Sequence, residues 1–338
     1  MSQVFPAAPP SLSRTLAPAF GLMLGACALP ALADDAAVEL PATQVTGQNV
    51  PYKADRASSA KIAVPLLDAP QSVNVVPREV LEEQNAQTLQ DVLRNVPGIT
   101  FMSGEGNLGW GDLFSIRGFS SEQSLTVDGV RDSGMSSRTD TFNLEQAEVY
   151  KGTGSVESGV SAIGGSVNLV SKRAHLGDDG KLSAGIGSDN YKRLTADINR
   201  EINDTSALRI NLMKHGNAVA ERDEVDYDRW GLATSFGFGL GTDTRFWLDA
   251  FYQKDENTPD GGVPIQRGTD GKRMPGVSRD AWYGDSSLYT QQTETRSLTG
   301  LFEHDFDDST TLRNQLRWQQ TDNWAVLSPA RFVAANAD

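Results

Sequence analysis

Four short phrases in the middle of the chain decide the fold: LFSIRGFS (113–120), SLTVDGVRDSG (124–134), FNLEQAEVYKG (142–152) and GGSVNLVSK (164–172). They consist of short apolar runs that are interrupted by glycine or by Asp-Gly. Runs of four to eight strand-forming residues between such turns predict short, tightly connected strands. Together with the helical segments before them, they predict a small α+β domain.

The helical segments precede Leu113. Gln71–Val76 alternates like a strand, and Pro77 is expected at the first position of a short helix that continues to Gln84. Thr88 and Asp91 have the spacing of a capping box for a second helix. That helix is expected to pack through one apolar face and to stop at Pro97-Gly98; the face consists of Leu89, Val92, Leu93 and Val96.

Length and charge exclude several classes of protein. The 338 residues fit two domains or one large one, and the net charge of −14 argues against nucleic acid or an anionic membrane surface as partner. After residue 35, no apolar run approaches the roughly 18 residues of a membrane-spanning helix. The 32 glycines and short alternating segments favour β structure instead.

The N-terminus has the features of an export signal at residues 1–33. Arg14 supplies a positive charge, Leu16–Leu29 is mostly apolar, and Ala31-Leu32-Ala33 is a cleavage motif. A loose lipoprotein-like box ending at Cys27 is the alternative. Cleavage after Ala33 removes the single cysteine, so we expect no disulfide, thiol catalyst or cysteine metal site.

Residues 34–65 are polar and are expected to form a flexible arm. Within the arm, Glu39–Gly47 is a short β-prone run. It is either part of a linker or a strand that pairs with the sheet edge of a partner.

From residue 177 to residue 338 the pattern changes to period two. Apolar residues such as Leu194, Ile198 and Leu212 alternate with polar ones, in segments of about ten residues. The connections are short at one end, for example Asp307–Thr310, and long at the other, up to Asp255–Gln291. This is the pattern of a transmembrane β-barrel, with a soluble β-sandwich as the alternative.

About seven such strands can be recognised, and an open sheet in hydrocarbon would leave two unpaired edges. A barrel wide enough to enclose a domain of this size needs about 22 strands. We therefore expect the barrel to be incomplete in this chain, as in a fragment or the product of an interrupted gene. The predicted fold class is an α+β domain followed by the first strands of an antiparallel transmembrane β-barrel, which is incomplete.

We identify no catalytic constellation, so an enzyme is not expected. His175, His215 and His304 are far apart in the sequence. Gly237, Gly239 and Gly241 have the spacing of a nucleotide-binding motif, but they lie on a predicted strand near a turn, so we do not assign that motif. The acidic run Asp223–Asp228 has oxygen ligands at calcium-like spacing, although a solvated acidic loop is the preferred interpretation. No metal site or cofactor is predicted.

The order and spacing of the four opening phrases resemble the plug domain of TonB-dependent outer-membrane receptors, in the siderophore-receptor branch. The resemblance implies a plug at residues 66–176. It also implies that the arm carries a TonB box, at Ala42, Thr43, Gln44, Val45 and Thr46. The expected location is the outer membrane, and the expected partners are TonB, membrane lipid and a ferric siderophore as the transported ligand.

Ferric catecholates are anionic and aromatic, so arginine and aromatic side chains suit them. The resemblance places Trp110, Arg131 and Arg138 on two plug loops that touch the ligand. The long loop adds a basic and aromatic set: Arg267, Arg273, Arg279, Trp282 and Tyr283. For each arginine, a surface ion pair is the alternative.

Arg117 is predicted to lie in a strand and to face the boundary between plug and barrel, where a buried arginine needs a carboxylate partner. The resemblance implies that Arg117 is a latch to the barrel wall. In the family, a second arginine commonly precedes the GGxVN phrase, but Ser158–Ile163 contains none. Part of the family's usual charge cluster between plug and barrel is therefore not expected here.

The sequence thus predicts an outer-membrane importer of ferric siderophores, with catecholates preferred over hydroxamates, that draws its energy from TonB. A passive outer-membrane pore and a transport-incompetent remnant of such a receptor are the alternatives.

Overall fold

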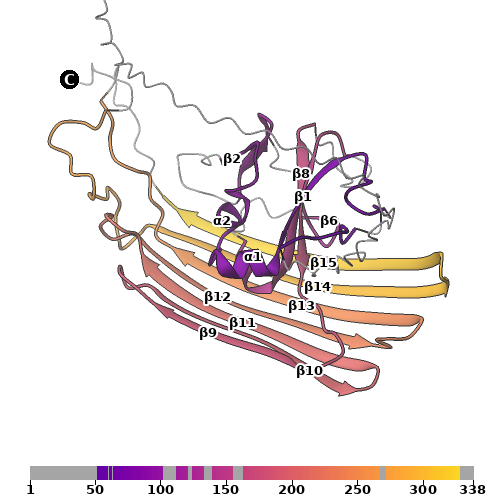
Figure 1. Ribbon diagram of the computed structural model, residues 1–338. Coiled ribbons are helices and arrows are strands. Elements are labelled where there is room, and N and C mark those ends of the chain that lie inside the picture. The colour runs from indigo at the N-terminus through magenta and orange to yellow at the C-terminus, as the bar shows by residue number, and fades with distance from the viewer. Residues whose placement is uncertain are drawn as a thin grey trace, which may run out of the picture. The chain divides into compact units, whose positions relative to one another are not determined.

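The computed structural model describes residues 52–59, 61–62, 64–101, 112–120, 124–132, 139–154, 163–266 and 272–327 (Figure 1). All of them lie within one unit, Gln48–Asp338. They form a small α+β domain followed by a seven-stranded antiparallel sheet, which confirms the predicted fold class.

The α+β domain has two small sheets and two short helices. One sheet has the order β1-β7-β8-β5-β6, and the other the order β2-β3-β4. The elements are β1 (Ser72–Pro77), α1 (Arg78–Glu83), α2 (Leu89–Leu93), β2 (Ile99–Phe101), β3 (Phe114–Ile116), β4 (Phe119–Ser120), β5 (Leu125–Val127), β6 (Val130–Arg131), the 3-10 helix η2 (Thr141–Asn143), β7 (Leu144–Lys151) and β8 (Gly165–Ser171).

The helix starts follow from local chemistry. Thr88 and Asp91 form the predicted capping box, because the Thr88 hydroxyl accepts from the Asp91 amide and the Asp91 carboxylate accepts from the Thr88 amide. Pro77 is the N-cap of α1 and still pairs with β7, so its predicted place as first helical residue was one position too far inside the helix. Its φ of −76° suits both neighbouring elements.

The domain has one apolar core beneath α2. Leu89 and Leu93 are fully buried there, together with Phe114 and Ile116 of β3. Strands β7 and β8 contribute Val149 and a further set of inward side chains: Ala147, Val167 and Leu169. Each large apolar side chain buried in this way contributes about 1.5–3 kcal/mol. The predicted face of the second helix is therefore confirmed as a packing face.

The large sheet has its strands in chain order, each antiparallel to the next. They are β9 (Asp179–Ile186), β10 (Lys192–Asn203), β11 (Ser206–Ala218), β12 (Asp226–Phe238), β13 (Thr244–Asn257), β14 (Thr290–Asp307) and β15 (Thr310–Val326). The predicted number of strands is confirmed. In the described part of the chain β9 and β15 are the edges, so the sheet does not close on itself.

In this sheet, the parity of the residue number decides which face a side chain occupies. Cross-strand partners have matching parity, except for the last pair beside the β10–β11 and β14–β15 turns. Exposed large apolar side chains are at even positions: Leu194, Ile198, Leu212, Trp230, Phe246, Leu248, Leu298, Leu316 and Trp318. Buried polar side chains are at odd positions: Asn199, Arg209, Asn211, His215, Arg229, Ser235, Gln253 and Asp255. The even face is the apolar outer face of a membrane barrel, and the odd face is the inner one.

The turns differ at the two ends of the sheet. At one end, residues 204–205, 239–243 and 308–309 connect the strands, while residues 187–191, 219–225 and 258–289 connect them at the other. Gly239 shows why the first kind is tight. Its φ is 66°, and a Cβ at this position would lie 2.1 Å from the carbonyl oxygen of Thr244, so only glycine fits.

No helix in the described residues has the length and apolar character needed to cross a membrane.

Candidate functional site

Several predicted site residues lie outside the described residues. These are the TonB-box residues Ala42, Thr43, Gln44, Val45 and Thr46, the plug-loop residues Trp110 and Arg138, and Arg267 of the long loop. Their roles remain predictions. Arg131 is described: it is an exposed residue at the end of β6.

The long loop between β13 and β14 carries Arg273, Arg279, Trp282 and Tyr283. The indole Nε1 of Trp282 donates to the carbonyl oxygen of Pro259 at 3.0 Å, and its ring packs edge-on against Tyr289. Tyr283 is exposed. Arg279 forms an exposed ion pair with Glu221 at 3.3 Å, so the alternative role of a surface ion pair applies to it in this structure.

Arg222, which the sequence did not single out, fastens this loop. Its guanidinium binds the Asp260 carboxylate through two nitrogens, at 2.8 and 2.5 Å. A third nitrogen donates to the carbonyl oxygens of Arg279 and Ala281, both at 2.9 Å. Because Ala281 precedes Trp282 directly, Arg222 fixes the backbone that carries the aromatic pair.

The acidic run Asp223–Asp228 is engaged in protein contacts. Asp228 pairs with Lys214, the Asp226 carboxylate accepts from the Thr258 hydroxyl, and the Asp223 amide donates to the Asp280 carbonyl oxygen. Nowhere in the described ranges do three or more acidic, histidine or cysteine side chains gather as metal ligands do. Calcium binding by this loop therefore gains no support.

Arg117 differs from its predicted environment. It lies in the turn between β3 and β4, with a φ of 53°, and its side chain is exposed rather than buried in a strand. The Ile116–Arg117–Gly118 phrase makes a tight hairpin between β3 and β4. The Arg117 amide donates to the carbonyl oxygen of Gly98, directly before β2, at 2.7 Å. Burial and the nearby Arg117 charge lower the pKa of Lys151. The latch role of Arg117 stays a prediction.

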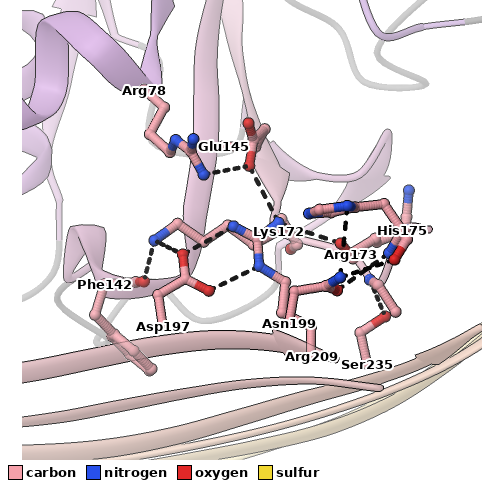
Figure 2. A network of polar contacts seen from close by, with 12 residues as sticks. Arg78, Phe142, Glu145, Lys172, Arg173, His175, Asp197, Asn199, Arg209 and Ser235 are labelled. Atoms are coloured by element: carbon pink, nitrogen blue, oxygen red, sulfur yellow. Dashed lines mark hydrogen bonds and ion pairs between the residues drawn. The ribbon is translucent and has the colours of Figure 1, made fainter. Parts of the chain in front are cut away.

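Other charged residues join the plug domain to the inner face of the sheet (Figure 2). Lys172, directly after β8, pairs with Asp197 of β10 at 2.9 Å. Asp197 also accepts two bonds from Arg209 of β11, each of 2.8 Å, and Arg209 lies 3.5 Å from Glu145 of β7. Lys172 and Arg209 are 8% and 3% exposed. Because they are buried, dissolved salt weakens the attraction in these ion pairs only slightly.

A second contact lies on the next strands. Arg173 pairs with Asp249 of β13 at 3.0 Å and with Asp128 of the β5–β6 turn at 3.5 Å. The Ala174 amide donates to the hydroxyl of Ser235, and the Ala174 carbonyl oxygen accepts from the indole of Trp247. The segment that leaves the plug is thus bonded to two barrel strands.

The third contact is the most buried one. Asp140, before η2, binds Arg193 of β10 through both carboxylate oxygens, at 2.6 and 3.0 Å, and lies 3.4 Å from Arg229 of β12. Burial alone raises the pKa of Asp140. The hydrogen bonds and charge of Arg193, with the charge of Arg229, outweigh that effect and hold the pKa below its ordinary value.

The sequence contained a signal for these residues that was not used. Arg193, Asp197, Arg209, Arg229 and Asp249 are charged residues at inner-face positions of strands whose other face is apolar. A charge on such a face needs a partner, and the only covering structure in the described residues is the plug. Their individual partners could not be predicted, because Asp140 and Arg193 are 53 positions apart.

Comparison with known proteins agrees with this geometry. Residues 65–166 match the TonB-dependent Receptor Plug Domain family. The chain is 36% identical over 323 residues to the probable TonB-dependent siderophore receptor PiuA of Acinetobacter baumannii. This alignment covers 93% of the chain and 43% of PiuA. It is 38% identical over 298 residues to the catecholate siderophore receptor Fiu of Escherichia coli K12, covering 84% of the chain and 39% of Fiu.

A crystal structure of PiuA superposes with a TM-score of 0.76 at 37% identity, over 81% of the chain and 39% of PiuA. The chain thus spans about two fifths of the length of these relatives. The relatives are receptors, which agrees with the prediction that the chain is not an enzyme. Residues 65–166 are a TonB-dependent receptor plug domain, and the strands that follow correspond to the barrel wall of siderophore receptors of this kind.

Proposed function

We propose that this chain is the plug and part of the barrel wall of an outer-membrane receptor that imports a ferric siderophore with energy from TonB. A signal peptide cleaved near Ala33 would direct it to that membrane. No resident cofactor is part of the proposal, because the iron complex is the cargo. The names of its relatives, a catecholate siderophore receptor and a probable TonB-dependent siderophore receptor, support this function.

One observation carries the proposal: the plug is held on the polar inner face of the sheet by the buried ion pairs of Asp140 and Lys172 and by the half-buried ion pair of Arg173. A plug domain held in this way blocks the barrel until its ion pairs with the barrel wall are broken. Breaking a buried ion pair costs about 3–5 kcal/mol, so spontaneous opening is rare. An external energy source fits such a plug better than passive diffusion does.

The ligand chemistry that we propose is that of a ferric catecholate. Arg131, Arg273 and Arg279 offer positive charge, and Trp282 and Tyr283 offer aromatic surface; Trp110, Arg138 and Arg267 complete the proposed set. Guanidinium groups suit the anionic oxygens of the complex, and aromatic rings suit its flat faces. Ligand binding would shift the population of arm conformations, so that TonB engages the Ala42–Thr46 segment of loaded receptors. Arg117 remains our candidate for an additional contact with the barrel wall.

Tryptophan fluorescence of the purified receptor tests the ligand class. We expect a ferric catecholate to quench it at concentrations where a ferric hydroxamate does not. Equal quenching by both would contradict the catecholate assignment. Iron uptake that continues at an undiminished rate without TonB would indicate a passive pore instead.

A further inference from the structure

Glu148 is a fully buried carboxylate in the middle of the plug sheet. It lies on β7, opposite Val75 of β1 and Asn168 of β8, and its exposed fraction is 0%. Its contacts with other described residues are hydrogen bonds from uncharged donors. An ionised group buried without a cation is costly unless hydrogen bonds satisfy it, so its donors are informative.

Three of these donors belong to the plug sheet itself. Gln146 Nε2 donates to Glu148 Oε1 at 2.7 Å, while the Tyr150 hydroxyl and Asn168 Nδ2 donate to Oε2 at 2.6 and 2.9 Å. The fourth donor is the backbone amide of Ser58, 2.5 Å from Oε1. Ser58 lies in the arm, 14 positions before the first residue of β1, so Glu148 binds a remote segment of backbone.

Ser58 has a second contact with this network, because its hydroxyl accepts from Asn168 Nδ2 at 3.4 Å. The other described side-chain contacts of the arm are different. Tyr52 donates to Glu83 at 2.8 Å, and Lys53 pairs with Asp55, but both contacts are exposed and exposed polar contacts contribute little. A hydrogen bond from an amide to a buried carboxylate is stronger, because one partner is ionised.

The same carboxylate is also connected to the β5–β6 hairpin. Asn168, which donates to Glu148, accepts through Oδ1 from the Thr126 hydroxyl and from the Gly129 amide, both at 2.9 Å. Gly129 is in the hairpin turn, and two residues later the chain reaches Arg131, one of the proposed ligand contacts. One hydrogen-bonded chain therefore joins this hairpin to the arm.

We propose that Glu148 is a positioning residue that clasps the arm at Ser58 and thereby sets how far the TonB box extends from the plug. This inference rests on the proposed function, because it assumes that TonB engages residues 42–46. From Thr46 to Ser58 the chain can span at most about 40 Å, whereas from Thr46 to Ser72, the first residue of β1, it can span about 90 Å. Opening the clasp thus more than doubles the reach of the box.

Two pairs of variants of the receptor in its membrane test the clasp. Glu148→Gln places an amide group where two donors converge. Ser58→Pro removes the amide that donates to Glu148 and also the Ser58 hydroxyl, which accepts from Asn168 Nδ2 at 3.4 Å. The matched controls are Tyr150→Phe, which removes a donor on the plug side, and Ser58→Ala, which removes the same hydroxyl as Ser58→Pro but keeps the amide. Hydrogen exchange of the arm amides is the readout: the Ser58 amide where it is present, and in every variant the Leu66 amide, which donates to the Asp55 carbonyl oxygen at 2.9 Å.

We expect exchange of these amides to be about tenfold faster or more in Glu148→Gln and, at Leu66, in Ser58→Pro, and to change little in the two controls. A cysteine placed at Gln44 should also crosslink to TonB more readily in Ser58→Pro than in Ser58→Ala when no siderophore is present. Unchanged exchange in both Glu148→Gln and Ser58→Pro overturns the clasp. Faster exchange without a TonB crosslink in any variant supports the clasp and contradicts the proposed function instead.

Discussion

Replacing Asp140 by asparagine tests how strongly the plug is held to the barrel wall. The substitution keeps the size of the side chain and an oxygen that can accept from the Phe142 amide, as Asp140 does at 3.0 Å. It removes the negative charge between Arg193 and Arg229, whose side chains are 10% and 7% exposed. In Asp140→Asn, the buried guanidinium groups of Arg193 and Arg229 both lose the carboxylate with which they pair.

The expected loss follows from that burial. Removing one partner of a buried ion pair costs about 3–5 kcal/mol, and we expect about 3 kcal/mol because the amide oxygen still accepts one hydrogen bond. A domain of this size has a urea dependence of about 1–3 kcal/mol per molar. The urea midpoint of the plug should therefore fall by about 1–3 M.

Hydrogen exchange of the β7 amides at increasing urea concentration measures this midpoint inside the receptor. Asp178→Asn is the matched control, because Asp178 pairs with Arg200 in an exposed contact that should contribute less than about 1 kcal/mol. If Asp140→Asn and Asp178→Asn shift the midpoint equally, the buried contact does not hold the plug.

Three further predictions concern other parts of the molecule. The folded state lowers the pKa of Asp140. Its contribution to plug stability should therefore be complete above about pH 4 and be lost as the pH falls through the lowered pKa. Between pH 6 and pH 2, the urea midpoint of Asp140→Asn should fall less than that of the unmodified receptor. Leu316→Arg puts a charge on the exposed outer face and should cost about 2–4 kcal/mol, reducing the yield of inserted receptor, whereas Gln315→Arg on the inner face should insert normally. Arg222→Lys cannot bind Asp260 through two nitrogens, so amide exchange in the 258–289 loop should rise about tenfold; unchanged exchange would show that Arg222 does not fasten the loop.

Much of the architecture could be predicted because it depends on local patterns. Alternation such as Leu194-Thr195-Ala196-Asp197 requires only that one face of a strand be apolar, so the two faces of the sheet were assigned correctly. The capping box of Thr88 and Asp91 is likewise contained within four residues.

The interface could not be predicted in the same way, because its partners are distant in the sequence. Nothing near Asp140 indicates Arg193, and nothing near Arg222 indicates Asp260. For Arg117, a local pattern gave a wrong prediction. Its apolar neighbours suggested a continuous strand, but Arg117 and Gly118 form a hairpin turn with φ values of 53° and 82°. Two consecutive positive φ values are those of a tight hairpin turn, and Arg at the first position gave no sign of it.

The most direct test of the central claim is iron accumulation by cells whose receptor carries Val45→Pro. Proline lacks the amide that a strand needs in order to pair with a partner, so the substitution should disable the proposed TonB box without changing the plug or the ligand site. We predict that a labelled ferric catecholate still binds to these cells but no longer accumulates inside them. Accumulation at the rate of the unmodified receptor would contradict the account.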